Sequence, residues 1–163
     1  MKLTLDVENT VTKRDGKMHL DPFEPENSLT MIGVLTDQGM EQHFPFDHSD
    51  VPNQQDYYER VQWYLDQATV LICHNAAYDL MWLWESGFKY DGPVFDTMLA
   101  EYVLQRGIKE PLSLEACAER YELDTKKQDT LKEYFKQGYS TRDIPYNELC
   151  EYLSADLHAT QQL

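Results

Sequence analysis

Lys2-Leu3-Thr4-Leu5-Asp6-Val7-Glu8, near the start of the chain, is the stretch that decides the fold. Its apolar and polar residues alternate, which is the pattern of a β-strand with one face in the core. Because side chains repeat every second residue along a strand, Asp6 and Glu8 emerge on the same face, roughly 6.6 Å apart. Two neighbouring carboxylates repel each other unless a positive charge lies between them. The pair therefore predicts a metal site.

The composition indicates one acidic, globular domain covering residues 1–163. The chain is long enough for a substantial core, and 42% of its residues are hydrophobic. Its 29 acidic residues outnumber the 14 basic ones and give a formal net charge of −15. A free-standing nucleic-acid-binding protein normally has a basic face, because phosphate contacts supply most of the affinity. If the partner is a polyanion, metal ions or another domain must supply positive charge.

The sequence also bears on where the protein resides. No apolar run is long enough to span a membrane, and the first residues do not have the pattern of a signal peptide. Cys73, Cys117 and Cys150 are widely spaced and belong to no CxxC or Cys/His cluster, which argues against zinc. We therefore expect reduced thiols in a cytoplasmic protein.

The first third of the chain predicts three antiparallel strands. After the opening strand, residues 9–27 form a polar passage in which Pro22 and Pro25 exclude a regular interior strand or helix. Residues 28–36 are apolar on both faces and predict a central strand, and residues 40–46 follow a turn and alternate more weakly. These strands would form a meander.

Helices and strands alternate in the rest of the chain. Residues 54–68 have the helical period, and residues 70–73 are a short apolar run typical of a buried parallel strand. A helix over residues 75–85 and a short strand over residues 93–95 follow, and Asp96 then caps another helix. The apolar residues that mark this helix and the three after it are Met98, Leu99, Tyr102 and Val103; Leu114, Cys117, Ala118 and Tyr121; Leu131, Tyr134 and Phe135; and Leu149, Leu153 and Leu157.

This order predicts an α/β fold with a mixed five-stranded sheet. The expected strand order is 3-2-1-4-5, with strands 1–3 antiparallel and helices flanking the sheet. The last helix begins near Pro145, and no stop signal ends it before Leu163. We therefore expect that the chain is a piece of something longer.

Two further motifs supply acidic residues. An Asp-x-Glu motif alone is weak evidence for a metal site, because about five such acid pairs are expected by chance from the composition. Asn75 ends a buried strand, and Asp79 lies four residues later on the same side of the next helix, among large apolar residues. Tyr152 and Asp156 share a face of the last helix. Each motif has a plain structural alternative, namely surface acids, a helix cap or an ordinary helical pair.

Taken together, the motifs resemble those of the DEDD exonuclease superfamily, whose fold is ribonuclease H-like. The matching segments are Asp-Val-Glu (6–8), Asn-Ala-Ala-Tyr-Asp (75–79) and Tyr-Leu-Ser-Ala-Asp (152–156). A tyrosine four residues before the last aspartate resembles the tyrosine (DEDDy) branch. HNAAYDLMWL and FDTMLAEYVL resemble the proofreading domains of family A DNA polymerases, particularly those of phages, which implies the cytoplasm of a host cell.

The resemblance implies a metal-dependent 3′-5′ exonuclease that acts on single-stranded or frayed DNA. Asp6, Glu8, Asp79 and Asp156 would bind two Mg²⁺ or Mn²⁺ ions, with Asp6 bridging them, and Tyr152 would orient the attacking water. Asn75 would shape the second motif or touch the terminal nucleotide, while His74 and His158 flank the site without binding metal. Candidate strand contacts are the basic residues Lys13, Arg14, Lys17, Lys126, Lys127, Lys132 and Lys136.

Two other functions fit the same residues. The ribonuclease D group shares the four acids and the tyrosine, so a 3′-5′ exoribonuclease is one alternative. A catalytically silent fold that docks nucleic acid is the other, although the complete set of acids argues against it. For the leading interpretation we expect a polymerase partner, either fused or separately encoded, because 163 residues are too few to include one.

Overall fold

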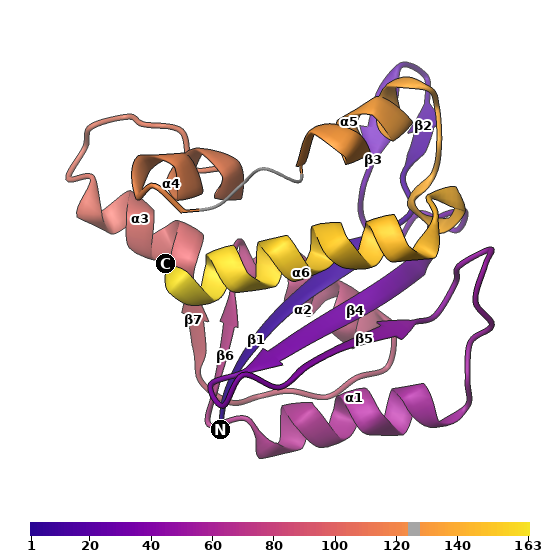
Figure 1. Ribbon diagram of the computed structural model, residues 1–163, viewed down its shortest axis with the longest axis horizontal. Helices are drawn as coiled ribbons and strands as arrows, with labels where there is room; N and C mark the ends of the chain where they lie inside the picture. Colours follow the sequence, from indigo (N-terminus) through magenta and orange to yellow (C-terminus); the bar gives the residue numbers. More distant parts are fainter. Residues whose placement is uncertain (124–127) are drawn as a thin grey trace.

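A mixed five-stranded sheet forms the centre of the computed structural model, which describes residues 1–123 and 128–163 (Figure 1). Its strands are β1 (Lys2–Asn9), β4 (Leu29–Thr36), β5 (Glu41–Pro45), β6 (Val70–Cys73) and β7 (Val94–Asp96). They are ordered β5-β4-β1-β6-β7. β1 pairs antiparallel with β4 and parallel with β6, so it lies at the centre. The predicted strand order and the mixed sheet are confirmed.

The helices cover the two faces of this sheet with separate cores. Their bounds are α1 (Asp56–Gln67), α2 (Ala76–Glu85), α3 (Thr97–Leu104), α4 (Leu114–Arg120), α5 (Gln128–Lys136), the 3-10 helix η1 (Thr141–Asp143) and α6 (Tyr146–Gln162). Leu3, Leu5 and Val7 face the core formed with α1 and α2. The predicted stripe of Leu149, Leu153 and Leu157 packs α6 onto the opposite face. Among the described helices, none is long and apolar enough to cross a membrane.

The polar passage over residues 9–27 contains a hairpin that we did not expect. β2 (Thr12–Arg14) pairs with β3 (Lys17–His19) in a small antiparallel sheet of its own. Asp15 and Gly16 between them have φ values of 52° and 76°, as a two-residue hairpin turn requires. This hairpin is largely exposed and separate from the main sheet, so it does not contradict the exclusion of an interior strand. The Asp-Gly pair was the overlooked signal.

The apolar residues that mark α3 in the sequence are largely exposed. Leu99, Tyr102 and Val103 are 58%, 64% and 65% exposed, whereas Thr97 and Glu101 are the buried residues of this helix. α3 follows β7 at the edge of the sheet (Figure 1), so it has fewer neighbours to pack against than a helix over the centre. Its attachment to the protein is therefore largely polar.

Candidate active site

Asp6 and Glu8 lie on the central strand, on the face covered by α6. Their apolar neighbours Leu5 and Val7 point to the opposite core, so the alternation of β1 turns both carboxylates away from it. Asp6 pairs with Gly33 of β4 in the sheet register. The backbone N–H of Val7 donates a 3.0 Å hydrogen bond to Oδ1 of Asp6. The strand itself thus fixes one carboxylate.

α6 brings a third carboxylate to this pair. Asp156 is 7% exposed and lies one residue before the core residue Leu157. One ligand oxygen from each of Asp6, Glu8 and Asp156 lies within 4.8 Å of the others, a spacing that could hold a metal ion. The acids of the first and third motifs, which are distant in sequence, therefore form one cluster.

Asp79, in the first turn of α2, is not one of these three acids, but the charge of Asp6 acts on it. It is 2% exposed, and its charge contributes to raising the pKa of Glu8. Asn75 directly precedes α2 in a left-handed conformation with a φ of 69°, but its side chain does not cap the helix within the described structure. The carboxylate of Asp96 accepts hydrogen bonds from the N–H groups of Asn75 (3.0 Å) and Ala76 (2.9 Å) instead.

Asp96 therefore accepts hydrogen bonds at the start of both α2 and α3, whereas the sequence predicted only its cap of α3. Its Oδ1 also accepts a 2.9 Å hydrogen bond from the N–H of Met98, which caps α3 as expected. β6 and β7 are adjacent parallel strands, so their carboxyl ends meet at one edge of the sheet. The second role depends on that pairing and has no local sequence signal.

Burial makes the acids of the site hard to ionise. It raises the pKa of Asp6 to about 7. Burial, followed by the charges of Asp6, Asp156 and Asp79, raises the pKa of Glu8 well above its ordinary value. For Asp79 burial is again the largest cause and the charge of Asp6 the next. A bound cation would favour the ionised forms and offset this repulsion.

The metal-free protein should lose stability as the pH rises from about 4 to about 7. In this window the unfolded chain has released the proton of Asp6 (ordinary pKa 3.8), whereas the folded protein keeps it because its pKa is about 7. Stability falls with pH wherever the folded state binds more protons. Melting temperatures measured in a chelator should fall over this window less steeply for Asp6→Asn than for the unchanged protein. Equal slopes would contradict this account.

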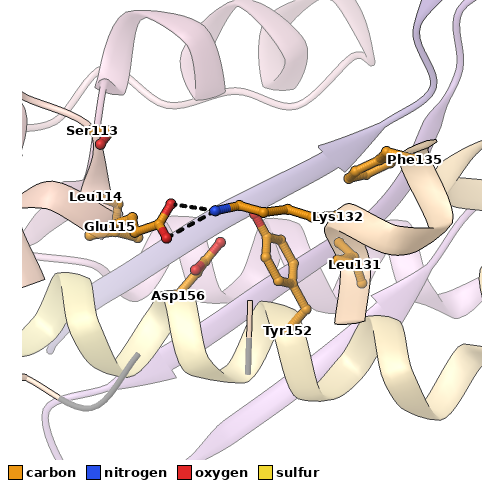
Figure 2. Close-up of a pocket in the computed structure, with 8 residues that line it drawn as sticks. All are labelled: Ser113, Leu114, Glu115, Leu131, Lys132, Phe135, Tyr152 and Asp156. Atoms are coloured by element: carbon orange, nitrogen blue, oxygen red, sulfur yellow. Dashed lines mark hydrogen bonds and ion pairs between the residues drawn. The ribbon is translucent and has the colours of Figure 1, made fainter. Parts of the chain in front are cut away.

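Tyr152 and Asp156 form one end of a pocket of about 210 Å³. The pocket is lined by Ser113, Leu114, Glu115, Leu131, Lys132, Phe135, Tyr152 and Asp156 (Figure 2). Burial raises the pKa of Tyr152, and the charges of Asp156, Glu8 and Asp6 raise it further. The phenol therefore stays protonated at neutral pH and can donate a hydrogen bond.

The basic residues differ in their distance from this pocket. Lys132 lines it, and its Nζ lies 3.0 Å from Oε1 of Glu115. Arg14 is instead 2.9 Å from the buried Glu24. Lys13 lines a separate pocket of about 410 Å³ together with Arg142.

The other basic candidates lie on α5, on β3 or outside the described residues. Lys136 is 3.8 Å from Glu133 on the outer side of α5. Lys17 is exposed in β3, and Lys126 and Lys127 lie outside the described residues.

Both histidines have polar partners. His74 forms hydrogen bonds with Thr97 Oγ1 and with the carbonyl of Leu112, both at 2.8 Å. His158 lies 3.1 Å from Glu41.

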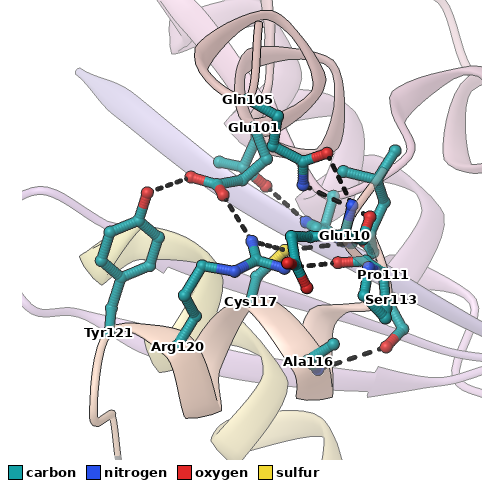
Figure 3. A network of polar contacts seen from close by, with 12 residues as sticks. Glu101, Gln105, Glu110, Pro111, Ser113, Ala116, Cys117, Arg120 and Tyr121 are labelled. Carbon is teal, nitrogen blue, oxygen red and sulfur yellow. Dashed lines mark hydrogen bonds and ion pairs between the residues drawn. The ribbon is translucent and has the colours of Figure 1, made fainter. Parts of the chain in front are cut away.

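A polar network holds the α4 side of the pocket (Figure 3). Glu101 of α3, 5% exposed, accepts hydrogen bonds from Arg120 Nη1 (2.8 Å) and from the hydroxyl of Tyr121 (2.6 Å). Arg120 Nη2 also donates a 2.7 Å bond to the carbonyl of Pro111. The network thereby fixes the segment that leads to Ser113 and α4. No local sequence pattern indicates this role of Glu101, because its partners come from α4 and its C-terminal end.

Glu101→Ala should destabilise the protein by about 1–3 kcal/mol, the usual cost of leaving the partner of a charged hydrogen bond unsatisfied. Arg120 would lose the buried carboxylate that accepts its hydrogen bond, and this ion pair between α4 and α3 would be lost. Chemical denaturation measures the change. Glu119→Ala removes an exposed glutamate from α4 and should change stability by less than about 0.5 kcal/mol. Equal costs for the two variants would show that the network contributes little.

Comparison with known proteins agrees with this geometry. Residues 19–163 match the family model of the DNA polymerase A type that is described as 3′-5′ exonuclease, a match that begins after Asp6 and Glu8. No curated protein matches the sequence. A solved structure described as the apo form of a nuclease has a TM-score of 0.64 at 19% identity, over 99% of this chain and 70% of its own.

A second solved structure extends the similarity in fold to a polymerase. The family B DNA polymerase from the hyperthermophilic archaeon Pyrobaculum calidifontis has a TM-score of 0.62 at 17% identity. The match covers 98% of this chain but only 23% of that polymerase. At such identities these two structures support the fold alone, which is ribonuclease H-like as predicted. On the strength of the family match, which covers most of its length, this chain belongs to the 3′-5′ exonuclease family of the DNA polymerase A type.

Proposed function

We propose that residues 1–163 form a single exonuclease domain of the tyrosine branch that removes nucleotides from the 3′ end of single-stranded or frayed DNA. The observation that carries the proposal is the cluster of Asp6, Glu8 and Asp156, whose ligand oxygens lie within 4.8 Å of one another. Its position beside a pocket that Tyr152 and Asp156 line gives a substrate access to it. Family membership supports the direction of cleavage.

The residues of the cluster fit Mg²⁺ or Mn²⁺. These cations prefer oxygen ligands, and the acids whose pKa burial raises need a positive charge to ionise. Asp6, Glu8, Asp79 and Asp156 would hold two such ions, which when bound supply a hydroxide at neutral pH and stabilise the departing oxygen. Asp79, which is outside the group of three, would act on its ion through water.

Tyr152 contributes as a hydrogen-bond donor. A phenol whose pKa is raised by burial and by three nearby carboxylates is a poor general base. It would instead orient the attacking water through its hydroxyl, while Asp156 four residues later approaches from the same helix face. Asn75 precedes α2 beside the same sheet edge, where it could touch the terminal nucleotide, and Lys13 and Arg14 would contact the strand only farther from the cluster.

Matched DNA and RNA oligonucleotides test the proposal. Each carries a 5′ label and is incubated with the protein and Mg²⁺ or Mn²⁺; we expect a ladder of products shortened from the 3′ end of the DNA. Degradation of RNA alone would favour a ribonuclease D-like exoribonuclease. Binding of DNA without release of any nucleotide would favour a silent docking module.

Proofreading requires a polymerase that delivers the 3′ end. The family match to polymerase A-type exonucleases supports such a partner, fused or separately encoded. The net charge of −15 supports it as well, because the domain alone offers little long-range attraction for DNA. We therefore expect weak binding of DNA by this domain alone, with a shallow salt dependence, because few phosphate contacts release counterions.

A further inference from the structure

An ion pair lies across the pocket beside the acidic cluster. Lys132 Nζ of α5 lies 3.0 and 3.1 Å from the two carboxylate oxygens of Glu115 on α4. Figure 2 shows this pair extending from the two helices toward each other above Tyr152 and Asp156. A strand that enters the pocket must therefore pass beside Glu115 and Lys132.

The charges of this pair act on a polyanion in opposite ways. Lys132 attracts a backbone phosphate, whereas Glu115 repels it and also occupies the lysine. The side chains of Lys132 and Glu115 are 53% and 37% exposed, and ion pairs of this kind contribute little stability. Exchanging the carboxylate of Glu115 for a phosphate at Lys132 therefore costs the protein little.

Lys132 is also the best placed of the basic residues considered above. Arg14 is held by the buried Glu24, and Lys136 lies near Glu133 on the outer side of α5. Lys132 alone among these three lines the pocket with Tyr152 and Asp156. A phosphate bound there would lie next to the acidic cluster.

We propose that Lys132 exchanges Glu115 for a backbone phosphate near the 3′ end of the strand, and that Glu115 limits strand affinity by competing for this lysine. This inference rests on the proposed exonuclease function. Glu115 thus makes the protein selective for strands that can displace it, and a free nucleotide product, with fewer phosphate contacts, leaves readily.

Neutralising the two residues separately tests the exchange. Strand affinity is measured by fluorescence anisotropy with a 5′-labelled oligothymidylate, in a shared Asp6→Asn background that prevents cleavage. Lys132→Gln should weaken binding about fivefold and reduce the salt dependence by about one phosphate contact. Glu115→Gln should tighten binding about two- to fivefold, because it removes a carboxylate that competes with phosphate for the lysine and that repels the strand. When Lys132 is already replaced by Gln, Glu115→Gln should increase strand affinity by a smaller factor.

A matched pair on the same helix provides the control. Glu133 and Lys136 of α5 approach to 3.8 Å at an exposed site, so Glu133→Gln and Lys136→Gln should each change affinity less than twofold. If the Glu115–Lys132 pair only joins α4 to α5, both of its variants should weaken binding together. Shifts in the same direction, or none, would overturn the proposal.

The proposed exchange can fail while the proposed exonuclease function holds, and the measurements distinguish the two cases. If the unchanged protein releases no nucleotide from DNA or RNA, the exonuclease proposal fails. If it degrades DNA while Glu115→Gln and Lys132→Gln shift affinity together, only the exchange fails. Melting temperatures of both variants, expected within a few degrees of the unchanged protein, establish that affinity is compared between folded molecules.

Discussion

Asp6→Asn should lower the rate of nucleotide release at least about a thousandfold, a loss of about 4 kcal/mol of transition-state stabilisation. The substitution removes one of the three clustered carboxylates that we propose to hold metal, and metal ions in such sites contribute several kcal/mol. The same change should raise the melting temperature of the metal-free protein. A buried carboxylate whose charge raises the pKa of Glu8 and of Asp79 is then gone.

The two effects together distinguish a metal site from an ordinary buried acid. Release of labelled nucleotide is measured with Mg²⁺ or Mn²⁺, and melting is followed in a chelator and with each metal. Asp37→Asn, which neutralises an exposed aspartate after β4, should leave both measurements unchanged. Retained turnover in Asp6→Asn would refute the assignment of the cluster.

Gly33→Ala should weaken metal binding about tenfold and destabilise the protein by about 1–3 kcal/mol, the usual cost of overpacking. A Cβ at Gly33 would lie 2.8 Å from Cγ of Leu153 and 2.9 Å from Cδ1 of Leu157. These leucines directly follow Tyr152 and Asp156. α6 would have to move away from β4, which would carry Asp156 away from Asp6.

Two further variants separate this displacement from a general loss of stability. Leu153→Ala removes the closest atoms and should restore part of the metal affinity in the Gly33→Ala background. Val34→Ala creates a cavity in the opposite core, so it should cost stability but leave metal affinity unchanged. Titration calorimetry with Mn²⁺ measures the affinity. If Gly33→Ala bound metal as tightly as the unchanged protein, the glycine would not set the spacing of the site.

Local patterns were sufficient to predict the sheet and the faces on which the acidic residues lie, whereas their joint role came from the resemblance to a family. Three patterns indicate which faces of the strands are buried: the alternation along β1, the apolar run of β4 and the short apolar run of β6. The strand order follows from the order of these elements along the chain. The helical spacing of Tyr152 and Asp156 likewise places both on one face of α6. What these patterns share is that each depends on residues within one element.

Apart from the β2–β3 hairpin, the features that the sequence did not predict depend on pairs of elements. Asp96 reaches α2 only because β6 and β7 are adjacent. Glu101 is buried only because Arg120 and Tyr121 come to it from α4 and its end. The Glu115–Lys132 pair likewise joins two short helices whose approach no local pattern specifies. The β2–β3 hairpin is different, since its Asp15-Gly16 turn was present in the sequence and was overlooked.

The position of α6 in the chain has a consequence for how activity arises during synthesis. Asp6 and Glu8 leave the ribosome before Asp156 and the leucines that cover their face of the sheet, which follow about 150 residues later. A nascent or prematurely terminated chain therefore has two of the clustered carboxylates and lacks the third. The cluster is complete only once α6 has docked on the sheet, so nuclease activity should arise only then.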